Sequence, residues 1–474
     1  MSLFFGNFAA MDNKKATLEL GTKPVGALLW QYALPAIIAM SAASLYNIVD
    51  SIFIGQKCGP LAISGLTITF PLMNFAAAFG AAVGVGASTF ISVKLGQKDY
   101  DMAEHILGNT VTLNIIIGIA VSVVSLLFLD PILRTFGASD ATLPYARSYM
   151  LIILGGNVFS HMYFGMNAVL RSASKPKQAM YATIFTVLMN TFLDFLFIIV
   201  FKWNIAGAAW ATILAQIMAL CWQMKLFSDK SQLLHLRRGI YRLKASIVRN
   251  IMAIGISPFA MNVCSSIVVI FVNTQLAHYG GDMDIAAYGI SNKVGTIFVM
   301  FVMGVNQGMQ PIAGYNYGAQ KLDRMMHVVK LSVIAATGIM TTGWLCAMFL
   351  PYWCSRIFTT DPTLITLSIK AIRLNLLMFP IIGYQMVITN FFQSIGKVRV
   401  SIFLSLSRQL LLLLPMLYFL PMIFNIDGVW YAMPGSDFLA AVIAAVVMIR
   451  FMNKFKRQHR ENMMRQAAGN DIDL

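Results

Sequence analysis

The stretch WQYALPAIIAMSAASLYNIVDSIFIG, residues 30–55, decides the fold class of this chain. It is apolar and long enough to cross a bilayer as a helix, for which about 20 residues suffice. Pro35 and Asp50 are unusual residues in such a span. A charged side chain at the centre of a bilayer costs roughly 3 kcal/mol or more, and it usually faces a cavity or a partner. Asp50 is therefore a candidate functional residue, with an internally hydrogen-bonded or interfacial carboxylate as the alternative.

The whole chain has the composition of a polytopic membrane protein. Of its 474 residues, 58% are hydrophobic and 11% are charged, whereas soluble domains carry about 25% charged residues. The net charge of +16 does not indicate nucleic-acid binding, because the basic residues gather in short connectors between apolar runs. The five cysteines form no CxxC pair, so neither a zinc site nor a disulfide framework is expected.

Apolar windows of membrane length predict twelve transmembrane helices, since open sheet is not viable in lipid. The predicted spans are residues 26–54, 61–92, 107–129, 143–170, 178–201, 205–225, 250–277, 286–314, 328–350, 364–392, 400–422 and 428–452. The connectors after even-numbered spans are the richer ones in Lys and Arg. The positive-inside rule therefore places both termini in the cytoplasm.

The chain is expected to divide into two lobes of six spans. The predicted segments are a cytoplasmic tail (1–25), an N-lobe (26–227), a basic amphipathic linker (228–249), a C-lobe (250–453) and a second cytoplasmic tail (454–474). We interpret the linker as an interfacial helix. The halves resemble each other at an offset of about 222 residues, as in Asn204-Ile-Ala-Gly207 and Asn425-Ile-Asp-Gly428. Six spans per repeat predict a pseudo-two-fold axis along the membrane normal and a central cleft.

Acidic residues inside the spans are concentrated in the N-terminal half. Asn190 and Asp194 lie four residues apart and so share a helix face, and their counterparts in the second half are apolar. Asp50, Asp194 and Thr212 each lie roughly seven residues from the outer end of a span, about 10 Å deep. Two carboxylates, an amide and a hydroxyl at one level suit a hard monovalent cation or a shared proton. Unrelated hydrogen bonds between helices are the alternative.

The sequence has none of the common motifs of soluble catalysis. HExxH, GxSxG, the phosphate-binding GxxxxGK[ST] and a GxGxxG that opens a βα unit are all missing. An enzyme or an ATP-driven pump is therefore not expected, and neither is a cofactor beyond a coupling ion. A secondary transporter remains. A cation channel fits less well, because a duplicated plan with one asymmetric site is not typical of a channel.

Motifs along nearly the whole chain resemble the multidrug and toxic compound extrusion (MATE) transporters. They are Leu45-Tyr-Asn-Ile-Val-Asp50, Leu170-Arg-Ser-Ala-Ser-Lys175, Asn190-Thr-Phe-Leu-Asp194, Gly207-Ala-Ala-Trp-Ala-Thr212, Ser405-Leu-Ser-Arg408-Gln409 and Gly428-Val-Trp430. The resemblance implies an all-α fold of two six-helix bundles that form a V. It also implies export of cationic amphiphilic compounds, in exchange for sodium or protons, across a bacterial inner membrane.

In the DinF-type branch of that family a cation binds in the N-lobe, and this chain has the matching residues. They are Asp50, Asn190, Asp194 and Thr212. The resemblance implies that these four hold sodium or a proton. The same branch bends its first helix at a proline, which matches Pro35, and Asn47 and Asn167 match network or gating positions. Another branch has acids in the seventh and tenth helices, and these are missing here, so a C-lobe cation site of that kind is not expected.

A lipid or lipid-linked oligosaccharide flippase of the same superfamily is the alternative function. Such a protein needs a basic cavity, and the predicted spans are nearly free of Lys and Arg, with Arg408 as the main exception. The expected partners are small organic cations, drugs and the lipid bilayer, with no nucleic acid and a functional monomer. The sequence leaves open the choice between sodium and protons, the exported compounds and the conformational state.

Overall fold

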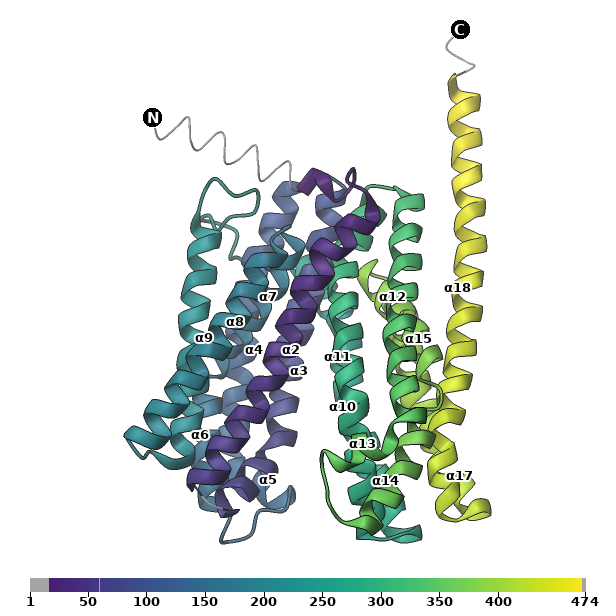
Figure 1. The fold of residues 1–474 in the computed structure, drawn as a ribbon. Coiled ribbons are helices and arrows are strands. Elements are labelled where there is room, and N and C mark those ends of the chain that lie inside the picture. The colour runs from purple at the N-terminus through teal and green to yellow at the C-terminus, as the bar shows by residue number, and fades with distance from the viewer. Residues whose placement is uncertain (1–16, 59, 471–474) are drawn as a thin grey trace.

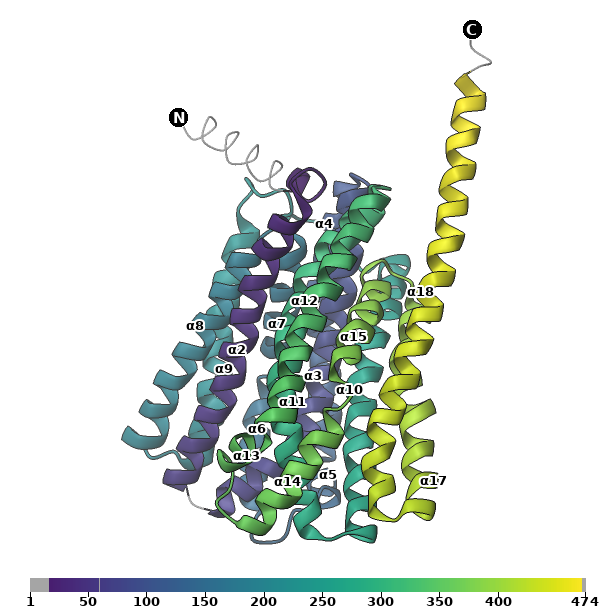
Figure 2. The same ribbon diagram turned by 45° about the vertical axis from the view of Figure 1, so that its right-hand side comes forward.

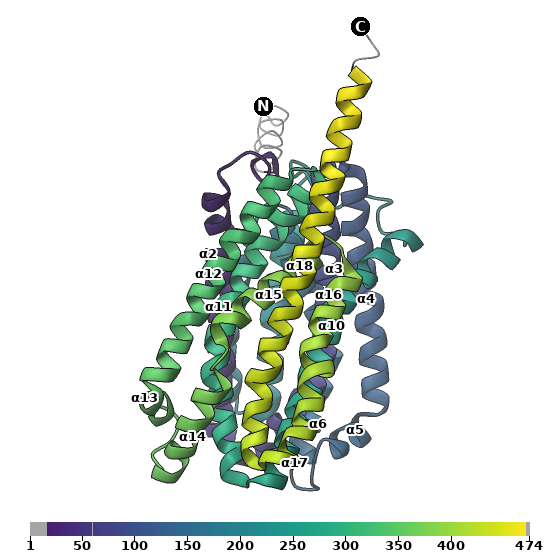
Figure 3. The ribbon, with the colours of Figure 1, turned by 90° about the vertical axis from the view of Figure 1, so that its right-hand side faces the viewer.

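The computed structural model describes residues 17–58 and 60–470, and these form a bundle of helices (Figure 1). The side chains of residues 45–61, 63, 64, 282 and 455–470 lie outside the description. Both ends of the described chain lie on one side of the bundle, here called the termini side, and the opposite side is the far side (Figure 1). Figures 2 and 3 show the last helix running past the bundle on the termini side.

The helices of the N-terminal half follow the predicted spans closely. They are α2 (Val25–Cys58), α3 (Pro60–Gly96), α4 (Tyr100–Leu127), α5 (Leu129–Thr135), α6 (Leu143–Gly155), α7 (Asn157–Ser172), α8 (Pro176–Asp194), the π-helix η1 (Phe195–Val200) and α9 (Asn204–Ser228). The predicted span 143–170 is divided at Gly156 into α6 and α7. A Cβ at Gly156 would lie 2.5 Å from Ile213, so the small residue lets α9 pack against this break.

The helices of the C-terminal half are also those that the hydropathy predicts. They are α10 (Ala245–Tyr279), α11 (Asp282–Gly318), α12 (Leu322–Phe349), α13 (Pro351–Arg356), α14 (Pro362–Asn375), α15 (Phe379–Ser394), α16 (Val398–Leu406), the π-helix η2 (Ser407–Leu413), α17 (Leu414–Phe424) and α18 (Ile426–Asn470). In the described residues, ten helices are long and apolar enough to span a membrane, or eleven if α14 and α15, bent by 50°, form one span.

The two halves contact each other through α2 with α11, α3 with α10 and α3 with α11. Glycines allow the closest approaches. A Cβ at Gly318 would overlap the carbonyl oxygen of Val93, and a Cβ at Gly96 would overlap that of Tyr315. The two contacts are related by the same offset of 222 residues (318 − 96 and 315 − 93). This pairing supports the duplication that the sequence predicts.

The apolar cores show where the halves join and where they separate. The largest cluster of buried apolar side chains belongs to both halves on the termini side and continues within the C-terminal half as far as Ala347 and Ile372. It includes Leu28, Ile91, Ile251 and Ile312. On the far side each half has its own cluster, one around Leu133 and Ile205 and one around Leu417 and Trp430. The halves therefore hold together at the termini side and have separate cores on the far side, as in a V.

Polar residues of α11 tie the halves together at the same level. Gln310 donates a buried hydrogen bond to Thr89 Oγ1 of α3 at 2.8 Å. Gln307 Nε2 lies 3.3 Å from the sulfur of Met40 on α2. The sequence leaves open whether these residues line a cleft or make internal hydrogen bonds, and the structure shows internal contacts between the halves.

The start of the described chain is held by the C-terminal half. Residues 17–20 form a short helical turn whose last carbonyls need partners. Lys321 Nζ donates to the Gly21 carbonyl at 2.8 Å, and Asn316 Nδ2 donates to the Leu20 carbonyl at 3.0 Å. Arg324 Nη2 donates to the Lys23 carbonyl at 2.5 Å. These contacts add a polar connection between the halves on the termini side.

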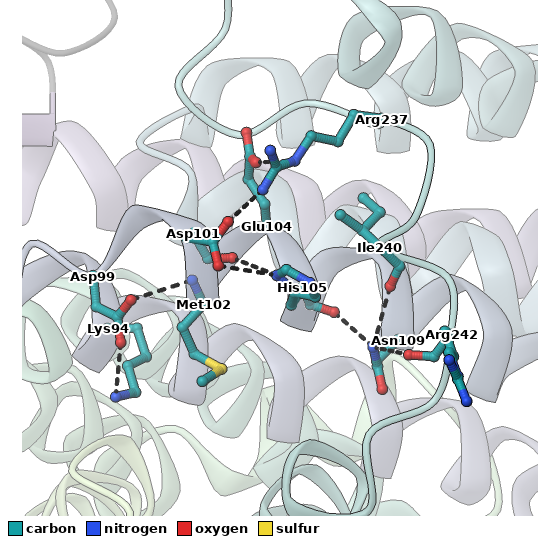
Figure 4. Close-up of polar contacts among 10 residues, drawn as sticks. All are labelled: Lys94, Asp99, Asp101, Met102, Glu104, His105, Asn109, Arg237, Ile240 and Arg242. Atoms are coloured by element: carbon teal, nitrogen blue, oxygen red, sulfur yellow. Dashed lines mark hydrogen bonds and ion pairs between the residues drawn. The ribbon is translucent and has the colours of Figure 1, made fainter.

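The connector between the halves is not the interfacial helix that its composition predicts. Residues 229–244 form turns and irregular backbone, and α10 begins only at Ala245. Figure 4 shows two of the contacts that hold the connector in this form, from Asn109 to Ile240 and Arg242. Asn109 of α4 donates to the carbonyls of Ile240 and Arg242, both at 3.2 Å, and accepts from the Lys244 backbone N–H at 2.9 Å. This side chain satisfies the backbone groups that a helix would have paired internally.

Charged residues fasten the same connector to α4 (Figure 4). Arg237 Nε lies 2.7 Å from Glu104 Oε2, and Arg237 also pairs with Asp101. His235 Nδ1 lies 3.0 Å from the other oxygen of Glu104. Burial of Ile240 adds an apolar anchor. The basic residues of the connector thus serve in part to hold it on the surface of the N-terminal half.

Candidate cation site

The best candidate for an ion site lies where α8, η1 and α9 meet in the N-terminal half. Asn190 and Asp194 are one helical turn apart on α8, and both are buried, with 1% and 0% of their surfaces exposed. Thr212 faces them from α9 and is also buried. The prediction from the i, i+4 spacing, that these side chains share a helix face, is consistent with this geometry.

The amide of Asn190 connects the other two residues. With its nitrogen toward Asp194, the amide donates to Asp194 Oδ2 at 3.0 Å, and its oxygen accepts from the Thr212 backbone N–H at 3.2 Å. In this orientation the amide oxygen of Asn190 also lies 3.3 Å from Thr212 Oγ1. The site therefore offers oxygen atoms of three kinds, which hard cations prefer.

The helix changes its hydrogen-bonding pattern directly after Asp194. Residues Phe195–Val200 form the π-helix η1, which continues α8 toward the far side. Such widened turns are rare, and they often occur at functional sites because they displace side chains and leave backbone groups available. Phe197 packs against Trp203 with ring centroids 4.9 Å apart, which anchors the end of η1 next to the start of α9.

Asp50 and Asn47 lie on α2, but their side chains are outside the described residues. The helix itself packs along α8 and also contacts α9 and η1. The structure thus places α2 beside the site and leaves the roles of its two polar residues as predictions. Pro35 lies inside α2 between Ala33 and Ile37, which contact Gly308 and Gly304 of α11. A bend at Pro35 would therefore act on the contact between the halves.

Asn167 lies nearer the termini side than the other predicted residues. Its nitrogen donates to the Ala179 carbonyl at 3.0 Å and to Thr183 Oγ1 at 3.3 Å, both on α8. Arg171 Nη1 donates to its oxygen at 2.5 Å. Thr183 is seven residues from Asn190, or about 10 Å along the helix. These contacts join α7 to α8 and do not bring Asn167 to the Asn190–Asp194 pair.

A buried acid in the C-terminal half corrects the expectation that buried acids are concentrated in the N-terminal half. Asp437 of α18 is 7% exposed and accepts from Arg408 Nε of η2 at 2.7 Å. Gln409 on the same π-helix donates to Ser265 of α10 at 2.9 Å. Arg408 is the single arginine of the eleventh predicted span. An arginine inside the membrane needs a counter-ion, so its presence could have predicted a buried acid nearby.

The donor set of the N-terminal site differs from that of a transition-metal centre. Among the residues that the structure describes, no group of three or more His, Cys, Asp and Glu side chains could hold a metal ion. The Asn190–Asp194–Thr212 cluster instead combines one carboxylate with neutral oxygens, and α2 brings Asp50 into the neighbourhood of α8. Such a set of oxygen donors suits a hard cation, and its carboxylate can also take up a proton.

Comparisons with known proteins agree with this architecture. The model of the MatE family matches residues 35–196 and 254–419. The multidrug export protein MepA of Staphylococcus haemolyticus is 26% identical over 426 residues, which cover 90% of this chain and 94% of that protein. MepA of Staphylococcus aureus (strain NCTC 8325 / PS 47) shows the same values.

Solved structures show the same fold. The multidrug transporter DinF-BH, in complex with R6G, is 32% identical with a TM-score of 0.85 and covers 92% of this chain and 98% of its own. An outward-facing MATE family transporter of the MOP superfamily is 21% identical with a TM-score of 0.88, covering 93% of this chain and 98% of its own. The family match covers more than half of the chain, and the helices described above have the arrangement of these transporters. The chain belongs to the MATE family of membrane transporters.

Proposed function

We propose that this protein exports amphiphilic drugs across the cell membrane in exchange for sodium or protons. The observation that carries the proposal is the fully buried Asp194, held by Asn190 at the junction of α8, η1 and α9. Asp50 on α2, with Thr212, would complete the ion site. The named relatives are multidrug export proteins, and this agrees with drugs as substrates rather than with the flippase alternative.

The proposed orientation has both termini in the cytoplasm. Lys and Arg are enriched in the connectors and tails of the termini side, which supports this assignment. The far side is then the outer side, and the described state is closed toward the cytoplasm. The two halves, residues 26–227 and 250–453, would move as lobes, and the close glycine contacts of α3 with α11 would separate when the termini side opens. One chain contains both halves, so the monomer is the proposed transport unit.

Coupling follows if the ion and the drug favour different conformations. Binding of an ion at Asp194 neutralises a buried charge, and α2 packs directly on α8. A change at the site can therefore reach Pro35 and the contact of α2 with α11. An ion with equal affinity for both conformations would not shift the equilibrium between them. The affinity of the site for the ion must therefore differ between the two conformations.

A reconstituted system tests the proposal. Purified protein in liposomes loaded with the cationic dye rhodamine 6G is given a sodium gradient or a pH gradient, one at a time. We expect dye transport driven by only one gradient, which identifies the coupling ion. Dye transport that ignores both gradients, by protein that is correctly folded, would refute the ion-coupled exporter and return attention to the flippase alternative.

A further inference from the structure

A second polar site lies in the C-terminal half, apart from the proposed ion site. A cavity of about 310 Å³ opens between α10 and α11 toward the far side. Its polar lining consists of Asn273, Tyr288, Asn292, Lys293 and Thr296. None of its described lining residues is acidic. Its volume is at the lower end of the range for small-molecule pockets, which is about 300–1,000 Å³.

The helical phase of α10 shows that the cavity faces the space between the halves. Gly255 of α10 packs so closely on α3 that a Cβ would overlap the Ala82 carbonyl oxygen. Asn273 lies eighteen residues further along, which is five turns at about 3.6 residues a turn. Asn273 therefore points in the same direction as Gly255, at a level where the halves have separate cores.

The helical phase of α11 also indicates that the cavity faces the N-terminal half. Gly304 is the contact of α11 with Ile37 of α2. Lys293 lies eleven residues nearer the far side, and eleven residues bring a helix back to within about 20° of the same direction. Lys293 thus extends the face of α11 that meets the N-terminal half. This position distinguishes it from a lysine on a lipid-facing surface.

Aromatic rings lie at the bottom of the space between the halves. Phe259 of α10, four residues beyond Gly255, contacts Phe79 and Phe75 of α3 with ring centroids 4.8 Å and 6.3 Å apart. Phe75 is 46% exposed. These rings lie fourteen residues, or about 21 Å, along α10 from Asn273, so they mark where the halves meet and are not part of the cavity.

Lys293 supplies positive charge to the cavity. Its Nζ lies 5.7 Å from the centroid of the Phe358 ring, in the connector between α13 and α14. Among the described residues, no carboxylate oxygen lies within the 4.0 Å of an ion pair with Lys293. The sequence prediction that Arg408 is the main basic residue of the spans therefore overlooked Lys293. A lysine with no described carboxylate beside it repels a cation and attracts a carboxylate.

We propose that this cavity binds the carboxylate of an amphiphilic substrate, with Lys293 as the charged partner. The amides of Asn273 and Asn292 can donate further hydrogen bonds to the same group, and Val269 and Ile285, which also line the cavity, can pack against the apolar part of the molecule. The inference rests on the proposed export function and assigns the carboxylate of a zwitterionic substrate to a named place in this chain.

The test compares two dyes that differ only at one group. Rhodamine 6G carries an ethyl ester, and its free acid carries a carboxylate on the same cationic ring system. Transport of each dye is measured in liposomes for the wild type, Lys293→Gln and Lys293→Arg. Lys202→Gln is the matched control, because Lys202 is an exposed lysine in the connector between η1 and α9.

We expect Lys293→Gln to reduce transport of the free acid about tenfold, the usual effect of a lost charge-assisted hydrogen bond. Rhodamine 6G transport should stay unchanged, which also shows that the variant is folded. Lys293→Arg should retain most of the free-acid transport, and Lys202→Gln should behave as the wild type. Equal loss of both dyes in Lys293→Gln, no loss of either, or a wild type that transports the ester alone would overturn the inference. A wild type that transports neither dye would instead count against the export function.

Discussion

Replacement of Asp194 by Asn is expected to abolish ion-coupled export. The amide has nearly the same shape, and Asn190 can still hydrogen-bond to it, so the folded protein should remain. The ion, however, loses the one described carboxylate of the site. Removing one partner of a buried charge pair typically costs about 3–5 kcal/mol. Ion binding should therefore weaken by a factor of about 100 or more, and dye transport should fall to the rate of protein-free liposomes.

Asp427→Asn is the matched control for this variant. Asp427 begins α18 on the far side, and its side chain is 42% exposed and pairs with Lys370. Exposed ion pairs contribute roughly 0–1 kcal/mol, so its loss should leave transport unchanged. The measurement is dye transport under the effective gradient, with the amount of folded protein checked by gel filtration. Wild-type transport by Asp194→Asn would remove this residue from the ion site.

Replacement of Gly318 by Ala is expected to open the termini side. A Cβ at this position would overlap the Val93 carbonyl oxygen of α3, which is backbone and cannot turn away. Overpacking of this kind costs about 1–3 kcal/mol. The strain applies only while α3 and α11 touch, so it should shift the conformational ratio away from the described state about 5–150-fold.

Gly338→Ala provides the control, because a Cβ at Gly338 of α12 would meet no atom within 4 Å. The conformational ratio can be followed by pulsed electron spin resonance in a background without native cysteines. Spin labels at Lys177 of α8 and Asp323 of α12, both exposed on the termini side, report the separation of the halves. Gly318→Ala should populate a longer distance, and Gly338→Ala should not. An unchanged distance in Gly318→Ala would contradict this prediction, because α3 and α11 would then relieve the overlap by sliding past each other while the termini side stays closed.

Much of the fold could be predicted from the sequence because lipid permits few alternatives. An apolar run of membrane length must be a helix, so the predicted spans fall on helical segments. Hydropathy is averaged over a window and does not register local geometry. It therefore missed the division at Gly156, the π-helices η1 and η2, and the bend between α14 and α15. The amphipathic pattern of residues 229–244 predicts a helix. It does not reveal that Asn109 of α4 pairs with backbone groups of this connector, which is therefore not helical.

The candidate site was predictable where helix periodicity determines it. The spacing of Asn190 and Asp194 fixes one face, and the depth of Thr212 places it at the same level. Contacts between helices are not encoded in this way. The partners of Asn167 on α8, the pairing of Asp437 with Arg408 and the cavity around Lys293 depend on how the helices pack, which no pattern within a single helix reveals.

The central claim is that ion binding at Asp194 and drug binding favour different conformations, so that drug binding displaces the ion. It is tested most directly by titrating the purified protein with rhodamine 6G and measuring the ion that is released. Protons are followed in weakly buffered solution, and sodium is followed with a radioactive tracer. The account predicts that one of these ions is released in proportion to the bound dye, in the wild type and in Asp427→Asn, and that Asp194→Asn releases none. Tight dye binding by the wild type without release of either ion would contradict it.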